Sequence, residues 1–156
     1  MHILHIYKTF TPEGFGGVEQ VIRQIASELV PEGVKISVLA LSDKISAPTT
    51  ITQAGITVHH FPTTIDVASN GISISAIKYF PALAKTADIL HYHFPWPTGD
   101  VLHQFAPKSI PTIVTYHSDI VRQRLLKIVY APLMEIFLRQ MDMIVATSPN
   151  YIETSP

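Results

Sequence analysis

The sequence contains no cysteine, which excludes a disulfide framework and thiolate chemistry and suits a reducing compartment. No run approaches the roughly 18 consecutive apolar residues that mark a membrane-spanning helix, and the N-terminus lacks the pattern of a secretory signal peptide. Eleven basic and twelve acidic side chains give a net charge of −1, so no overall field favours nucleic acid as a partner. We expect a cytoplasmic protein and leave peripheral contact with the inner face of the membrane open.

What the chain does have is apolar periodicity. Its 156 residues are 47% hydrophobic, enough for one domain with a substantial core. Short apolar segments predict about six strands, at 3–7, 35–41, 56–61, 88–94, 112–116 and 143–146. Amphipathic segments predict helices at 18–30, 73–85 and 120–140, the last kinked or split by a proline at 132. A further short helix is predicted to end at about 105. This alternation predicts an α/β fold with a doubly wound parallel sheet in the order 3-2-1-4-5-6. The stretches 45–54 and 62–70 are expected to be loops.

A glycine-rich loop, Gly14-Phe15-Gly16-Gly17, separates the first strand from the helix at 18–30. The first amides of a helix lack intrahelical partners and lie at its positive end, so glycines there let a phosphate reach bare backbone. The alternative is that Gly16 and Gly17 only form a tight turn. The dinucleotide fingerprint G-x-G-x-x-G is not met, because Glu19 stands at the third glycine position. A nicotinamide oxidoreductase is therefore disfavoured, although it stays an alternative.

Polar and aromatic residues cluster where the fourth and fifth predicted strands end. His93 and Trp96 follow one strand, and His117 and Asp119 follow the next. The carboxyl ends of parallel strands form the edge where ligands bind in open α/β sheets. We expect His117 either to contact substrate or act as a base there, or to cap the following helix. His91 and His93 point to one face of a strand, but local spacing supplies no third ligand, so no metal site is predicted.

Two further segments leave alternatives. The helix at 120–140 combines basic and apolar residues, so it either packs on the sheet with a solvated basic face or lies on anionic lipid. Ser148-Pro149 is typical of a helix start, yet the sequence stops a few residues later. We expect that the chain is part of a longer protein.

Five segments, taken together in chain order, form a recognisable set: Met1-His2-Ile3-Leu4-His5-Ile6-Tyr7-Lys8, the loop 12–17 running into Gly17-Val18-Glu19-Gln20-Val21, His91-Tyr92-His93-Phe94-Pro95-Trp96-Pro97, Thr115-Tyr116-His117-Ser118-Asp119, and Ile144-Val145-Ala146-Thr147-Ser148-Pro149. This set resembles the N-terminal half of a family-4 retaining glycosyltransferase with the GT-B fold, from the branch that builds bacterial surface polysaccharides. The resemblance covers the whole chain. It implies that 1–156 is a Rossmann-like acceptor-side domain, and that a C-terminal donor-binding domain is absent from this chain.

The resemblance also implies a reaction and roles for residues. The enzyme would move a sugar from a nucleotide-diphosphate sugar to a saccharide or lipid-linked saccharide in polysaccharide biosynthesis, as a hexosyltransferase, with no cofactor and no metal. The implied site consists of His117 near the reacting carbon of the donor, Gly16 and Gly17 at its diphosphate, and Phe15, His93, Trp96 and Asp119 on the acceptor side. The family's diphosphate clamp and paired glutamates are missing from this chain, which alone is expected to transfer no sugar. The alternative is a non-catalytic ligand-binding or interaction module on a Rossmann-like fold.

Overall fold

The computed structural model describes residues 1–12, 14–67, 69–118 and 124–148, with the side chains of 124–129 left out. Its strands are β1 (His2–Ile6), β2 (Lys35–Ser42), β3 (Thr49–Gln53), β4 (Ile56–Pro62), β5 (Ile65–Val67), β6 (Asn70–Ile72), β7 (Ile89–Phe94), β8 (Thr112–Tyr116) and β9 (Met143–Ala146). Its helices are α1 (Gly17–Leu29), α2 (Ile74–Ala84), α3 (Pro97–His103) and α4 (Arg124–Arg139).

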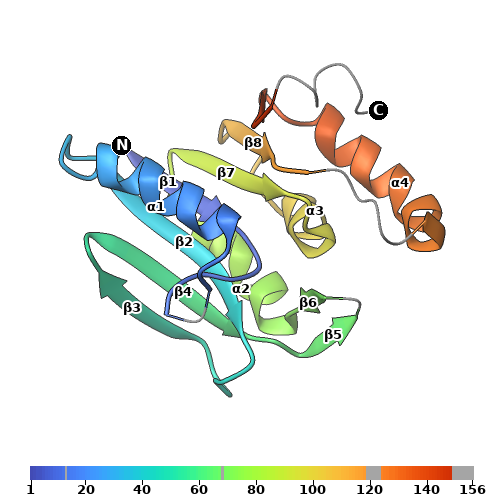
Figure 1. Cartoon of the computed structure of the whole chain (residues 1–156), viewed down its shortest axis with the longest axis horizontal. Coiled ribbons are helices and arrows are strands. Elements are labelled where there is room, and N and C mark those ends of the chain that lie inside the picture. Colours follow the sequence, from blue (N-terminus) through green and yellow to red (C-terminus); the bar gives the residue numbers. More distant parts are fainter. Residues whose placement is uncertain (13, 68, 119–123, 149–156) are drawn as a thin grey trace.

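Seven strands form one sheet in the order β3-β4-β2-β1-β7-β8-β9 (Figure 1). All neighbouring strands pair in parallel except β3, which runs antiparallel to β4. Without β3, the order is the predicted 3-2-1-4-5-6, so the predicted fold class and topology are confirmed. Parallel strands buried on both faces read as continuous apolar runs, and all five residues of the central strand β1 are buried.

The two faces of the sheet carry two separate cores. Leu4 and Ile6 of β1 pack with Leu90 and Tyr92 of β7 on the face that also receives apolar residues of α2, α3 and α4. Ile3 of β1 belongs to the other core, which includes residues of α1; α1 crosses β1 and β2 in Figure 1. Because side chains alternate along a strand, the odd-numbered residues of β1 and β7 share the α1 face. This alternation decides which polar residues meet near the site.

Helix α1 begins and ends within one residue of its predicted bounds. Helix α4 contains Pro132 inside one continuous helical segment, so the proline does not split it. The segment expected either to pack on the sheet or to lie on lipid begins at 120, and its residues 120–123 lie outside the described ranges. No helix in the described part of the chain is both long and apolar enough to cross a bilayer.

Two short pieces of sheet replace the predicted loops. Strand β3 is a Thr-rich edge strand joined to β4 through Ala54 (φ 50°) and Gly55 (φ 77°). Two consecutive positive φ values are typical of a two-residue type I′ hairpin turn. Strands β5 and β6 form a separate antiparallel pair with three residues in each strand. Apolar alternation did not predict β3 or the β5–β6 pair. β3 and β5 are largely exposed, and pairing with a neighbouring strand makes them strands, not their own hydrophobicity.

Candidate active site

The candidate residues collect at the carboxyl edge of the parallel strands. The glycine loop follows β1, Trp96 follows β7 and His117 follows β8, and these three strands are adjacent in the sheet. Parallel pairing brings their ends to one edge, as the sequence predicted. Asp119 lies outside the described residues, so its predicted acceptor-side role stays a prediction.

The glycine loop leaves open space at one position only. Gly16 is the N-cap of α1, with an extended backbone and no side-chain cap among the described residues. A Cβ placed on Gly17, the first helical residue, would meet no described heavy atom within 4 Å. A ligand can therefore approach the backbone of Gly17 at the positive end of the helix.

A buried carboxylate occupies the space beside the other two glycines. Glu19 is 5% exposed, and its Oε1 accepts a hydrogen bond of 2.6 Å from Thr9 Oγ1. A Cβ on Gly14 would lie 2.6 Å from Oε1 of Glu19, and one on Gly16 would lie 2.7 Å from Oε2. Gly14 and Gly16 thus make room for Glu19, whereas Gly17 faces outward. Sequence patterns identified Glu19 only as the residue that breaks the dinucleotide fingerprint, although a glutamate at the third helical position is a known capping signal.

Arg23 holds the loop from the next turn of α1. Its guanidinium lies over the rings of Phe10 and Phe15, at 5.0 and 4.9 Å from their centroids. Its Nη2 also donates a hydrogen bond of 2.7 Å to the carbonyl oxygen of Gly14. Phe15 remains 77% exposed, so its ring is available to a ligand at the surface. Sequence periodicity placed Arg23 on the polar side of α1 and could not detect these cation–π contacts.

Four histidines from three strands meet on the α1 face of the sheet. Nδ1 of His5 hydrogen-bonds Nε2 of His93 at 3.0 Å, and Nδ1 of His93 hydrogen-bonds Nε2 of His117 at 2.9 Å. Nε2 of His91 hydrogen-bonds Oγ1 of Thr115 at 2.7 Å. The rings also stack, with centroids 4.6 Å apart for His91 and His93. Only His91 and His93 could be related by sequence spacing, since the others join them through strand pairing.

Burial keeps these imidazoles neutral. Desolvation lowers the pKa of His91 to about 4, and the neighbouring His117 adds to the effect. It also holds the pKa values of His5 and His93 well below the usual range, with further lowering from nearby histidines. His117 is partly buried, and desolvation alone lowers its pKa. At neutral pH, His117 therefore offers one N–H donor and one lone pair.

The cluster has the composition of a metal site, but most of its ring nitrogens already form hydrogen bonds. One nitrogen from each of His5, His91 and His93 lies within 4.8 Å of the others. Nitrogens that bind one tetrahedral metal at about 2.1 Å lie roughly 3.4 Å apart. Both ring nitrogens of His93 already hydrogen-bond other histidines. We interpret the cluster as a hydrogen-bonded one, and the absence of a metal stays a prediction.

Two residues expected on the acceptor side lie behind the edge. His93 and Trp96 are each 2% exposed. The indole Nε1 of Trp96 donates to the carbonyl oxygen of Gly71 at 3.3 Å, and its ring lies 3.0 Å from where a Cβ on Gly99 would stand. Burial of a large apolar ring under α3 explains this position. In this arrangement both side chains are buried behind the edge, and their acceptor-side role stays a prediction.

An open cavity of about 500 Å³ lies at the same edge, at the carboxyl ends of β1, β2 and β4. The ends of β1, β2 and β4 and the β5–β6 pair line it, and its charged residues are Lys8, Asp43, Lys44 and Asp66. Nζ of Lys8 donates a hydrogen bond of 3.2 Å to the carbonyl oxygen of Ser69. The sequence analysis missed this cavity because it depends on the unpredicted β5–β6 pair.

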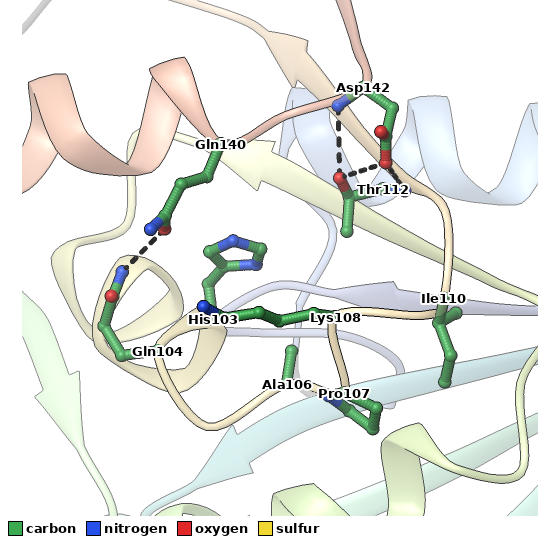
Figure 2. Close-up of a pocket in the computed structure, with 9 residues that line it drawn as sticks. All are labelled: His103, Gln104, Ala106, Pro107, Lys108, Ile110, Thr112, Gln140 and Asp142. Carbon is green, nitrogen blue, oxygen red and sulfur yellow. Dashed lines mark hydrogen bonds between the residues drawn. The ribbon is translucent and has the colours of Figure 1, made fainter.

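A second cavity, of about 230 Å³, lies at the opposite edge of the sheet (Figure 2). Oδ2 of Asp142 accepts hydrogen bonds from the backbone N and Oγ1 of Thr112, at 2.8 and 2.9 Å. These bonds are the main reason that the pKa of Asp142 is lowered. Gln104 donates to Gln140 across the cavity at 3.3 Å. The lining groups bond to one another and tie α3 and α4 to the start of β8, far from His117 along that strand.

Proteins of known family and structure share this fold. The profile of Glycosyltransferase Family 4 matches residues 15–154, so the chain belongs to this family. Solved structures similar to the chain include an alpha-glucosyltransferase in complex with UDP-glucose and DNA containing an abasic site, with a TM-score of 0.59 and 16% identity over 99% of this chain and 38% of that one. Another is trehalose-6-phosphate from E. coli bound with UDP-2-fluoro glucose, with a TM-score of 0.57 and 11% identity over 96% and 40%. The fold is one half of a GT-B fold.

Two curated relatives are named as bacterial glycosyltransferases, one of them for the O-antigen chain. The chain is 45% identical over 155 residues to D-rhamnosyltransferase WbpZ of Pseudomonas aeruginosa, covering 99% of this chain and 40% of the relative. It is 41% identical over 156 residues to O-antigen chain mannosyltransferase C of Escherichia coli, covering 99% and 42%. The predicted family is thereby confirmed. The chain spans about two-fifths of the length of these relatives.

Proposed function

We propose that this chain is the acceptor-side domain of a retaining glycosyltransferase that moves a hexose-type sugar from a nucleotide-diphosphate sugar to a saccharide or lipid-linked saccharide in polysaccharide biosynthesis. The observation that carries the proposal is the pairing, at one sheet edge, of open backbone at Gly17 with a partly buried, neutral His117. Membership of family 4 and the names of the two curated relatives support it. A second domain, beyond 1–156, would bind most of the donor.

The open cavity is the proposed acceptor site. Its two lysines and two aspartates balance in charge, so it suits a neutral, hydroxyl-rich ligand better than a polyanion. Carboxylates accept hydrogen bonds from sugar hydroxyls, and ammonium groups donate to them. The exposed ring of Phe15 offers an apolar surface on the glycine loop. A lipid-linked saccharide would place its sugar end in this cavity.

The donor would lie between the two domains. The Gly17 backbone would receive the diphosphate at the start of α1, and His117 would hydrogen-bond the donor sugar. By family resemblance, the leaving phosphate takes the acceptor's proton, so this chain need not supply a nucleophile. The remaining groups that stabilise the departing diphosphate would belong to the other domain, because electrostatic stabilisation needs donors placed around the developing charge. The chain alone is therefore expected to transfer no sugar.

Replacing His117 tests the proposal. In the two-domain protein, His117→Ala should lower kcat by about a hundredfold or more, the usual effect of removing a group that acts in the transition state, with little change in melting temperature. His103→Ala is the matched control, because His103 is also partly buried with a lowered pKa but lines the cavity at the opposite edge. Normal turnover per folded molecule in His117→Ala would contradict the proposed role.

We also propose that the transfer occurs at the cytoplasmic face of the membrane, with peripheral contact through residues 120–140. In the described part of this segment, Met134 and Phe137 pack in the core, whereas Ile136 is 48% exposed. The sequence of this segment carries the basic residues Arg122, Arg124, Lys127 and Arg139, and we propose that their charge attracts it to anionic lipid.

Vesicle binding tests this contact. The protein should co-sediment with anionic vesicles and be released by about 0.5 M salt, since screening shortens the reach of exposed charges. Arg124→Glu combined with Lys127→Glu should abolish the binding. Equal recovery with neutral and anionic vesicles would assign this helix to core packing alone.

A further inference from the structure

We propose that His5 and His93 are positioning residues that hold His117 in a single neutral tautomer, with its hydrogen on Nδ1. The consequence for turnover rests on the function proposed above. The tautomer itself is a property of this chain that can be measured without substrate.

Two hydrogen bonds link three of the histidines in a row. Nδ1 of His5 bonds Nε2 of His93, and Nδ1 of His93 bonds Nε2 of His117. A neutral imidazole has one N–H and one lone pair. If His5 donates to His93, then His93 must donate to His117, and the reverse holds if His117 donates. When all three imidazoles are neutral, this row of hydrogen-bonded histidines thus has only two proton arrangements. The tautomer of His5 determines that of His117.

A third arrangement, with a protonated His93 donating in both directions, is disfavoured. His93 is 2% exposed, and three imidazoles surround it. Desolvation and these neighbours lower its pKa far below the usual range. A cation at this position would be buried, and its ring neighbours among the described residues are one tyrosine and three histidines, none of which carries a negative charge.

His5, the buried end of the histidine row, selects between the two arrangements. Nε2 of His5 is buried and has no hydrogen-bond partner among the described residues. The nearby Nε2 of His91 is engaged with Thr115. Orphaned buried backbone N–H groups are rare in folded proteins, and we extend this rule to the imidazole, so we assign the lone pair and not the N–H to Nε2 of His5. Nδ1–H of His5 then donates to His93, and Nδ1–H of His93 donates to Nε2 of His117.

His117, the partly buried end of the histidine row, is the residue with the proposed function. His117 is partly buried at the carboxyl end of β8, and its remaining nitrogen, Nδ1, carries the hydrogen in this arrangement. A fixed N–H at the edge binds an oxygen lone pair, such as that of a sugar hydroxyl or a phosphoryl group. The opposite tautomer would present a lone pair to the same oxygen. Fixing the tautomer therefore orients His117 before the donor arrives.

The first test is spectroscopic. In the chain labelled with ¹⁵N-histidine, long-range ¹H–¹⁵N correlation spectra at neutral pH should show a protonated Nδ1 and an unprotonated Nε2 for His117. His93→Leu should release the constraint and give averaged shifts from two exchanging tautomers. His93→Gln can both donate and accept, and it should restore the parent pattern. Should His93→Leu fail to fold, His5→Leu carries the same expectation. A protonated Nε2 on His117 in the parent, or one unchanged tautomer in the leucine variant, would overturn the proposal.

The second test is kinetic. In the two-domain protein, His93→Leu should lower kcat about tenfold, equivalent to about 1.4 kcal/mol, with the KM for the acceptor unchanged, and His93→Gln should recover much of the loss. His91→Leu is the control, because His91 lies on the same strand and face but bonds Thr115. It should lower the melting temperature while leaving the His117 tautomer intact. The expected spectra with parental kcat in His93→Leu would overturn the positioning role. A two-domain protein that transfers no sugar would refute the proposed function, while the spectra still decide the tautomer.

Discussion

Gly17→Val in the two-domain protein is expected to abolish most sugar transfer, with kcat/KM lowered by a hundredfold or more, while the fold persists. The reason is steric and electrostatic. A Cβ on Gly17 meets no described heavy atom within 4 Å, so valine disturbs little of the protein itself but fills the space that a diphosphate needs. Losing one preorganised donor to a developing negative charge costs about a hundredfold to a thousandfold in rate.

The neighbouring glycine supplies the comparison. A Cβ on Gly16 would lie 2.7 Å from Oε2 of the buried Glu19, so Gly16→Val should lower the melting temperature as well as the activity. Gly17→Val should instead keep the melting temperature and lose binding of nucleoside diphosphate, measured by titration calorimetry. If Gly17→Val folds, binds and turns over like the parent, the anion site does not lie at this helix start.

The free energy of unfolding should be greatest near neutral pH and fall steeply toward pH 5. An ordinary histidine has a pKa near 6.5, whereas burial lowers the pKa of His91 to about 4 and those of His5 and His93 well below the usual range. Below pH 6.5 the unfolded chain therefore binds protons that the folded chain does not. Each such proton costs about 1.4 kcal/mol per pH unit, so stability conferred by these histidines is lost as pH falls.

Asp100 acts with the opposite sign. It is buried in α3 and accepts a hydrogen bond from the hydroxyl of Tyr130, and desolvation raises its pKa to about 8. Between its ordinary value of 3.8 and pH 8, the folded chain holds a proton that the unfolded chain has lost, so this term reduces stability as pH rises. Below pH 6, the proton held by Asp100 in the folded chain cancels the effect of roughly one of the three histidine protons. The free energy of unfolding should therefore fall by about 2–3 kcal/mol for each pH unit.

Urea unfolding at pH 5, 6, 7 and 8 measures both terms. Asp100→Asn keeps an acceptor for Tyr130 but cannot ionise, so it should remove the decline between pH 7 and 8. His91→Leu should make the acid slope shallower by one proton. A stability profile that stays level from pH 7 to 5 would contradict the neutral, buried histidine cluster.

The site shows where prediction from sequence stops. The edge and its principal candidates, Gly17 and His117, could be identified because both follow apolar strands directly. Glu19 was identified only as the residue that breaks the dinucleotide fingerprint, and Arg23 was not singled out. Their roles depend on the path of the loop, which folds back over the helix start so that Arg23 contacts Phe10 and Phe15. His5 was read as part of a strand because its partners are far away in sequence.

The sequence by itself determined the order of the six parallel strands and the bounds of α1. Apolar periodicity is a local signal that each segment carries alone, and the chirality of crossovers leaves few topologies for such an alternation. Only the tertiary structure decided which glycine faces outward and that Trp96 is buried. It also decided that β3, β5 and β6 exist and that the histidines form a hydrogen-bonded row. His5 bonds a residue 88 positions away, and His93 bonds one 24 positions away. Those contacts follow from strand order and register, which place side chains of adjacent strands together on one face, and no pattern within a single segment encodes them.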